Sequence, residues 1–262
     1  MFEFSRYYGR RRVKGSAALT AGLAILTGLY MYMFPSFSDG IDLDAYAEQF
    51  PPALREAFGV EALGTIEGFL ATELYNFGWV LLLGLFLAYS AASLIADDVE
   101  DGRLDMLLAM PVSRSKVLLE KFSSLLVPIA LTNAVLPVFV YLGALGIGES
   151  ISAADLAMVH VLSLPYLLTA AAIGLLASVV FDRTSLAQRA AMGVVFGLFL
   201  VESVVANTDY AALGALSPTR YYDPTAVLVR SQWDLGGAAI LLGATVVLLA
   251  VSLVHFKRKD IT

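Results

Sequence analysis

Few side chains in this sequence could do covalent or metal chemistry. The chain has no cysteine and only two histidines, His160 and His255, which lie far apart, each near one end of an apolar segment. No GxxxxGK[ST], HExxH or GxSxG pattern occurs, so nothing indicates a nucleotide-phosphate loop, a zinc protease or a hydrolase nucleophile. A lone histidine near a helix end is typical of an interfacial position. We therefore expect no catalytic residue, no metal site and no cofactor held by this chain.

Charged side chains are concentrated instead at residues 97–122, between two long apolar segments. This stretch holds six carboxylates and four bases: Asp97, Asp98, Glu100, Asp101, Asp105, Glu120, Arg103, Arg114, Lys116 and Lys121. So many charges are too costly to place in hydrocarbon. We interpret the stretch as a solvent-facing loop of a membrane protein.

The middle of this loop has the pattern of a short docking helix. Gly102 interrupts one helix, Pro111 ends the short apolar piece that follows, and Ser113 is placed to cap the next helix. The piece presents its apolar side chains to a partner's groove, namely Leu104, Leu107, Leu108 and Met110. The charges of Arg103, Asp105 and Arg114 would set the register of that contact.

Composition predicts an all-α polytopic membrane protein that forms a single domain over residues 1–262. Hydrophobic residues make up 58% of the chain and charged residues only 15%, whereas about a quarter of a soluble domain is charged. A helix needs about 20 apolar residues to cross the hydrocarbon core. Six segments satisfy this, at residues 17–35, 74–96, 123–147, 156–181, 186–206 and 236–256.

The first 35 residues resemble a signal peptide in having a basic stretch before an apolar one. The apolar run at 17–35 is longer than a signal core and lacks a small-x-small cleavage pattern. We interpret it as a retained span, with removal as the alternative.

Lysine and arginine are distributed unevenly between the two sides of these spans. Fourteen of the 17 lysine and arginine residues fall at the termini, in the second loop or around the fourth loop. The positive-inside rule therefore places both termini in the cytoplasm. We expect the protein in the plasma membrane. The net charge of −6 is unusual for a membrane protein. It indicates either acidic outer loops or the acidic surfaces of a salt-adapted organism, for which an archaeon is one candidate.

The outer side offers few candidate residues. The outer segments 36–73 and 207–235 are either solvated caps or a gate. Glu202 is the one acidic residue well inside a predicted span; such a residue either faces a gate, substrate or subunit, or reaches to the interface. In the same helix, Gly193 and Gly197 form a GxxxG pattern that favours close helix packing, within one chain or between subunits.

The charged loop resembles that of the permease subunit of type-2 (ABC-2) ATP-binding-cassette exporters. The resemblance rests on acidic-x-x-G-[TR]-L-[ED]-x-L-L-x-x-P-[VI]-[ST]-R-x-x-[IVL]-x-x-x-K, which matches from the acidic residues before Gly102 to Lys121. Arg103 stands where the family often has threonine. The ending Phe256-Lys-Arg-Lys-Asp-Ile261 is also similar to the family's aromatic-x-[RK]-[RK]-D-[IL].

By this resemblance, residues 102–110 are the coupling helix that docks on a separate ATPase dimer, and Asp98, Glu100 and Asp101 are the acidic end of the second span. The resemblance also implies that residues 1–15 form an interfacial helix before the first span. The partners implied are that ATPase, which would bind ATP and Mg²⁺, a second permease copy or paralogue, and membrane lipids, but no nucleic acid. Two other functions stay open: a membrane-embedded enzyme, and a scaffold or channel that works without an ATPase.

Overall fold

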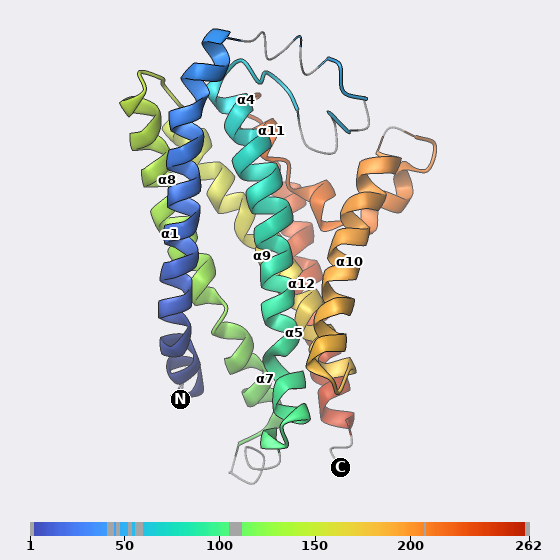
Figure 1. Ribbon diagram of the computed structural model, residues 1–262. Coiled ribbons are helices and arrows are strands. Elements are labelled where there is room, and N and C mark those ends of the chain that lie inside the picture. Colours follow the sequence, from blue (N-terminus) through green and yellow to red (C-terminus); the bar gives the residue numbers. More distant parts are fainter. Residues whose placement is uncertain are drawn as a thin grey trace.

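The computed structural model describes residues 3–40, 45, 48–51, 54–55, 60–104, 112–206 and 208–259, and this part of the chain is helical without any strand (Figure 1). Six runs in it are long and apolar enough to cross a membrane: Arg12–Ser38, Ile66–Glu100, Arg114–Gly146, Ala153–Val180, Thr184–Val205 and Leu235–Arg258. Each predicted span overlaps one of them almost entirely. The prediction of an all-α protein with six spans is confirmed.

The first helix, α1, runs from Glu3 to Gly40 without a break. The segment expected to be a separate interfacial helix therefore continues directly into the first span. Its only proline is Pro35, and isolated glycines weaken a helix without breaking it. Helix α1 lies along α8 (Leu126–Gly146), at one side of the bundle (Figure 1).

The second span is built from three consecutive helical pieces. Thr65 caps α4 (Ile66–Leu70) by accepting a hydrogen bond from Gly68 N at 3.1 Å. The chain then widens into a π-helix, η1 (Ala71–Leu83), and continues as α5 (Gly84–Glu100). The helical run thus begins before the predicted start at residue 74, because the Thr65 cap satisfies its first amide groups.

The next helices are α7 (Arg114–Ser123), α8, α9 (Ala153–Val180) and α10 (Thr184–Val205). Ser113 and Ser152 cap α7 and α9 with their hydroxyl groups. A short interruption separates α7 from α8, whereas α9 and α10 are joined by a tight turn.

Beyond α10 the chain forms three short helices before the last span. These are η2 (Ala211–Leu216), η3 (Pro218–Tyr221) and α11 (Pro224–Leu228), followed by α12 (Leu235–Arg258). Pro218 begins η3 and Pro224 begins α11, positions where a missing amide hydrogen has no cost. Helix α11 contacts α9, η1 and α4.

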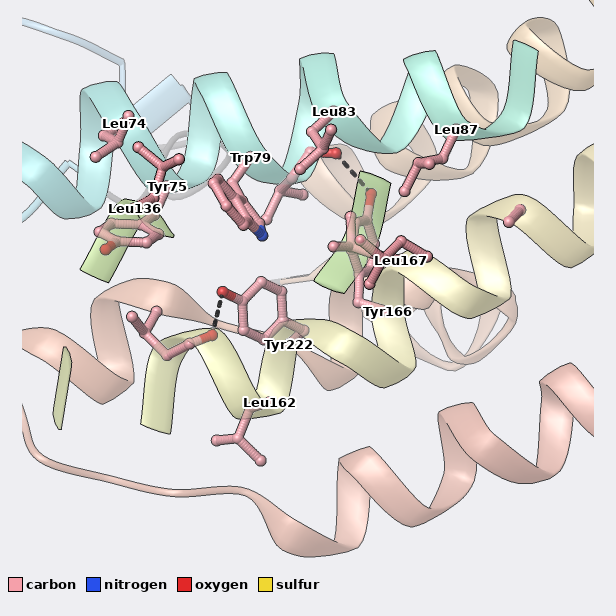
Figure 2. Close-up of a cluster of buried hydrophobic side chains, with 14 of the residues drawn as sticks. Leu74, Tyr75, Trp79, Leu83, Leu87, Leu136, Leu162, Tyr166, Leu167 and Tyr222 are labelled. Carbon is pink, nitrogen blue, oxygen red and sulfur yellow. Dashed lines mark hydrogen bonds between the residues drawn. The ribbon is translucent and has the colours of Figure 1, made fainter. Parts of the chain in front are cut away.

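Helix α9 lies at the centre of the bundle, in contact with α5, α8, α10, α11 and α12. Around it the core contains large aromatic and aliphatic side chains from η1, α5 and α9, together with Tyr222 (Figure 2). Tyr166 donates to Val80 O and Tyr222 to Val159 O, each at 2.8 Å. The outward faces of α1, α8, α10 and α12 carry many exposed aliphatic and aromatic side chains, as expected of surfaces that meet lipid.

Candidate functional site

The second loop leaves the bundle at the end of α5 and returns at the start of α7. Gly102 follows the helix with φ +64°, a backbone angle that glycine adopts without steric cost. Arg103 and Leu104 come next, and the Leu104 side chain is fully buried in the core. The expectation that Leu104 presents its side chain to a partner is therefore wrong. The other predicted docking residues lie outside the residues that the structure describes; they are Asp105, Leu107, Leu108, Met110 and Pro111.

Asp98 joins the start of this loop to α7, the helix that follows the loop. Its side chain accepts a hydrogen bond from Lys121 Nζ of α7, and its other carboxylate oxygen lies 3.4 Å from Arg103 Nε. Lys121 Nζ also donates to Leu94 O at 2.8 Å. Asp98 and Lys121 are only 5% and 4% exposed. One carboxylate therefore connects α5, the start of the loop and α7 inside the protein.

Arg103 binds the other acidic side chains at the end of α5. Its guanidinium lies 2.8 Å from Asp97 Oδ2 and 2.9 Å from Asp101 Oδ2, and these three side chains are about half exposed. Loss of hydration opposes its charge, but Asp101, Asp97 and Asp98 outweigh this and raise the pKa of Arg103. Exposed pairs of this kind are each worth about 0–1 kcal/mol, so their main effect is to orient the start of the loop.

The expectation that all charges at 97–122 face solvent is wrong for part of the stretch. Asp98, Glu120 and Lys121 are buried. A buried charge is tolerated when an opposite charge and hydrogen bonds compensate for lost hydration, as they do for Asp98 and Lys121. The charges thus divide into an internal ion pair and an exposed group around Arg103.

Glu100 joins α5 to the α9–α10 turn. Its Oε2 atom accepts a hydrogen bond from Thr184 N at 2.8 Å. Thr184 is the first residue of α10, and Arg183 before it gives no side-chain cap. A carboxylate at a helix N-terminus satisfies an unpaired amide and interacts favourably with the helix dipole. The sequence assigned Glu100 to a partner contact, whereas the structure turns it toward a neighbouring helix of the same chain.

Arg114 connects the returning end of the loop to the last helix. Its Nη1 atom donates to Phe256 O at 3.0 Å and to Lys259 O at 2.6 Å. Ser113 accepts a hydrogen bond from Lys116 N at 3.3 Å, which confirms the predicted cap. The Arg114 guanidinium therefore satisfies carbonyl groups at the end of α12.

These contacts bring together the segments rich in lysine and arginine. The two termini, the ends of the second loop and the α9–α10 turn lie at one end of the bundle, which we call the charged end (Figure 1). Arg12 of α1 also reaches α7 there, since its Nε donates to Ser124 Oγ at 3.1 Å. Within the part of the chain that is described, no group of three His, Cys, Asp or Glu side chains is placed to hold a metal ion.

A protein-family model described as "ABC-2 family transporter protein" matches residues 18–261, nearly the whole chain. The chain belongs to this family. It is accordingly a membrane permease subunit of an ABC transporter, and the permease is not the ATPase component but associates with an ABC ATPase subunit. No curated protein sequence matches the chain.

At the opposite end of the permease, which we call the cap end, Glu202 of α10 lies under η2 and η3. Its Oε2 atom is 3.8 Å from Arg220 Nη1, and its side chain is 17% exposed. Gly214 of η2 packs directly against this carboxylate, so that a methyl group there would collide with Oε2. Arg220 also donates to Ala211 O. Glu202 therefore connects α10 to η2 and η3. We call residues 208–234, which include these two helices and α11, the cap segment.

Gly193 and Gly197 are not part of this contact. A Cβ atom added to either would meet no other atom of the chain within 4 Å, so both glycines border open space beside α10. Their GxxxG pattern is thus available on the outside of the monomer, where a second helix could approach closely.

A buried polar network in the permease core has no counterpart in the sequence-based predictions. Tyr75 OH lies 3.0 Å from His160 Nε2, and His160 Nδ1 lies 3.1 Å from Asn133 Oδ1, which also accepts from Ser163 at 2.9 Å. Because Asn133 Oδ1 can only accept, Nδ1 carries the hydrogen and Nε2 accepts from Tyr75. The expectation of an interfacial His160 is wrong, since this residue is 3% exposed.

The spacing of these residues held a signal that could have indicated the network. His160 and Ser163 are three residues apart, and Tyr75 and Trp79 are four apart, so each pair shares a helix face. The Trp79 and His160 rings meet edge to face with centroids 4.9 Å apart. Which faces oppose each other depends on how η1, α8 and α9 pack, and the spacing does not encode that.

Proposed function

We propose that this permease is the membrane subunit of an ATP-driven exporter and that a separate ATPase dimer acts on its second loop. Two permease chains, identical or different, form one pathway, while ATP and Mg²⁺ bind in the ATPase subunits. Closure of the ATPase dimer pushes the apolar residues Leu107, Leu108 and Met110, and the displacement reaches the cap end. The observation that carries this proposal is the attachment of the start of the loop and of α7, the helix that follows the loop, to one buried carboxylate, Asp98.

This attachment supports a mechanical role for the loop. Lys121 ties α7 to Asp98, and Arg103 ties the start of the loop to the same side chain. A force on the loop would therefore move α5 and α7 together, rather than being absorbed by bending at the loop ends. A loop without such contacts would yield locally.

The second span offers a continuous route from the charged end to the cap end. Its helical run from Ile66 to Glu100 contains 35 residues, which is roughly 50 Å at about 1.5 Å per residue. Near its far end, Asn76 Nδ2 donates to Thr225 Oγ1 of α11 at 2.9 Å. Displacement of α5 along its axis would thus act on α11 and the cap segment that contains it.

The outer face of α10 supports a dimeric pathway. Gly193 and Gly197 border open space there, and large apolar side chains such as Val194, Leu200 and Val204 flank them in exposed positions. Small residues at this spacing allow backbones to approach closely in lipid. We place the contact with the second permease chain on this face.

The proposed orientation puts the charged end in the cytoplasm, where the ATPase is found. Because the chain has no cysteine, a single cysteine at Lys116, which is exposed at the start of α7, gives an unambiguous label. A membrane-impermeant thiol reagent should modify this variant only after the cells are opened. Modification in intact cells would reverse the topology and remove the basis for coupling to a cytoplasmic ATPase.

The decisive experiment replaces Leu107 and Leu108 together by aspartate. The proposed contact with the ATPase would bury both leucines. Losing them would remove at least about 3 kcal/mol of binding free energy, which raises the Kd for the ATPase roughly a hundredfold. ATPase subunits that co-purify with the unaltered permease should be lost, or the permease-stimulated part of ATP hydrolysis should disappear. The permease itself should stay monodisperse in detergent.

A matched control adds the same two charges beside the docking residues. Ser113→Asp with Ser115→Asp places one carboxylate at the N-cap and one in the first turn of α7, where a carboxylate can cap the helix and is compatible with its dipole, and removes no apolar side chain. This control should retain the ATPase. Equal ATPase binding and stimulation in the Leu107/Leu108 variant would show that this loop does not couple the two proteins.

A further inference from the structure

The end of α12 is held between two other parts of the charged end. On one side, Arg114 of α7 donates to the carbonyl groups of Phe256 and Lys259, and its guanidinium carbon lies 5.9 Å from the centre of the Phe256 ring. Phe256 is fully buried in the core. The end of α12 is therefore anchored both by its own aromatic side chain and by α7.

On the other side, Lys259 binds the α9–α10 turn. Its Nζ atom donates to Val179 O at 2.9 Å and to Phe181 O at 3.5 Å, and it lies 2.6 Å from Asp182 Oδ1. Carbonyl groups at the end of a helix have no partner within the helix, and a lysine there satisfies them while interacting favourably with the dipole. The Lys259 side chain is 9% exposed, whereas Asp182 is 72% exposed, so the contacts with the carbonyl groups lie on the protected side.

We propose that Arg114 and Lys259 are positioning residues that transmit movement of the second loop to the α9–α10 turn through the end of α12. This inference rests on the proposed function and extends it, because it adds a second route beside α5. Residues 256–259 act as a bracket: Arg114 fixes one side of it and Lys259 the other. A push on the loop then moves α9, α10 and α12 together with α7.

The bracket complements the contact that Glu100 makes with Thr184. Glu100 ties the α9–α10 turn to α5, and Lys259 ties the same turn to α12 and, through Arg114, to α7. The turn is thus held from both ends of the second loop. Removing Lys259 removes the polar contacts between the turn and the end of α12, so the separation between α7 and α10 should become less narrowly defined.

The first experiment measures that separation in the permease alone. Because the chain has no cysteine, spin labels can be placed at Lys116→Cys on α7 and Ser185→Cys on α10, both at exposed positions. The distribution of distances between the labels should broaden in the Lys259→Met variant. Lys257→Met, which removes an exposed lysine two residues earlier in the same helix, should leave it unchanged. An unchanged distribution in Lys259→Met overturns the bracket.

The second experiment measures coupling in the complex with the ATPase that co-purifies with the permease. Lys259→Met should retain the ATPase but lower permease-stimulated ATP hydrolysis by roughly two- to thirtyfold, the range for residues that transmit coupling without contacting a ligand. Lys259→Arg, which keeps the charge and donors, should restore most of it. A Lys259→Met complex with full stimulation overturns the proposal.

Failure of the proposed function gives a different result. In that case the unaltered permease retains no ATPase, while the spin-label distances still respond to Lys259→Met. Should Lys259→Met not fold, Asp182→Asn is the alternative, because it removes the ion pair and leaves both carbonyl contacts. It should give a smaller broadening in the same direction, and no broadening would overturn the bracket.

Discussion

Replacing Lys121 by methionine tests the buried ion pair beneath the second loop. Methionine has nearly the length of lysine, so packing is preserved and the substitution removes mainly the charge and its hydrogen bonds. It leaves Asp98 buried without the Lys121 ammonium and leaves Leu94 O without its donor. Breaking a buried pair by removing one partner costs about 3–5 kcal/mol.

The structure places the expected value at the lower end of this range. Asp98 keeps Arg103 Nε at 3.4 Å after the substitution, so its charge is partly compensated. We therefore expect Lys121→Met to lower the free energy of unfolding by about 3 kcal/mol. Asp98→Asn should lower it by about 4–5 kcal/mol, because it removes the carboxylate in direct contact with the buried ammonium of Lys121.

The double variant measures the interaction energy between Asp98 and Lys121 separately from the contacts that each makes with other residues. With Asp98→Asn and Lys121→Met together, no isolated charge is buried, so the loss should be smaller than the sum of the single losses by about 2–3 kcal/mol, within the range for residues in contact. The assay is unfolding of the purified permease in mixed detergent micelles. Lys257→Met is the control: this lysine is exposed on α12, and its substitution should change stability by about 0.5 kcal/mol or less. Losses below about 1 kcal/mol for both single variants, or strict additivity, would refute the reasoning.

Two further substitutions test the packing of the bundle. Gly174→Ala places a methyl group against Ala88 O where α9 crosses α5, and we expect a loss of about 3 kcal/mol in unfolding free energy from overpacking. Gly243→Ala on α12 meets nothing within 4 Å and should be neutral in the same measurement. Tyr75→Phe removes the hydroxyl group that donates to His160 Nε2 and should cost about 1–3 kcal/mol for the buried acceptor left unpaired, again measured by unfolding. Unchanged stability of Gly174→Ala or of Tyr75→Phe would contradict the corresponding contact.

The spans and the shared end of the termini followed from properties that act locally along the chain. Apolar length indicates a membrane helix, and the placement of lysine and arginine indicates which segments share a side. The cap at Ser113 is equally local, since a hydroxyl group satisfies an amide three residues later. These features need no knowledge of how one helix packs on another.

Other features depend on pairs of residues far apart in the sequence, and these the sequence pattern missed. Arg114 binds carbonyl groups about 145 residues away, and Lys121 is buried because Asp98 on another helix compensates for its charge. The same reason explains His160, whose partners lie on η1 and α8. A charged or polar residue can be predicted to be exposed only when no residue on another helix compensates for its burial.

The interruption between α7 and α8 indicates how movement is divided within the permease. Helix α7 ends at Ser123, and α8 begins at Leu126. Before the interruption, Lys121 connects α7 to α5 and Arg114 connects it to α12. After the interruption, α8 packs mainly on α1. We expect α7 to move with α5 and α12 when the second loop is pushed, because its buried ion pair and carbonyl contacts all lie on that side.

The second span has no such interruption, which makes it the more direct route to the cap end. Its helix changes from α to π at Leu83 without a break in the chain of backbone hydrogen bonds. The π-helical part lies in the half next to the cap end, where Asn76 contacts α11, and π-helical segments occur frequently at functional sites. A push on the second loop would pass along the rigid α-helical half of this span and reach α11 at the wider, π-helical half. Helix α11 is the part of the cap segment that packs against this span.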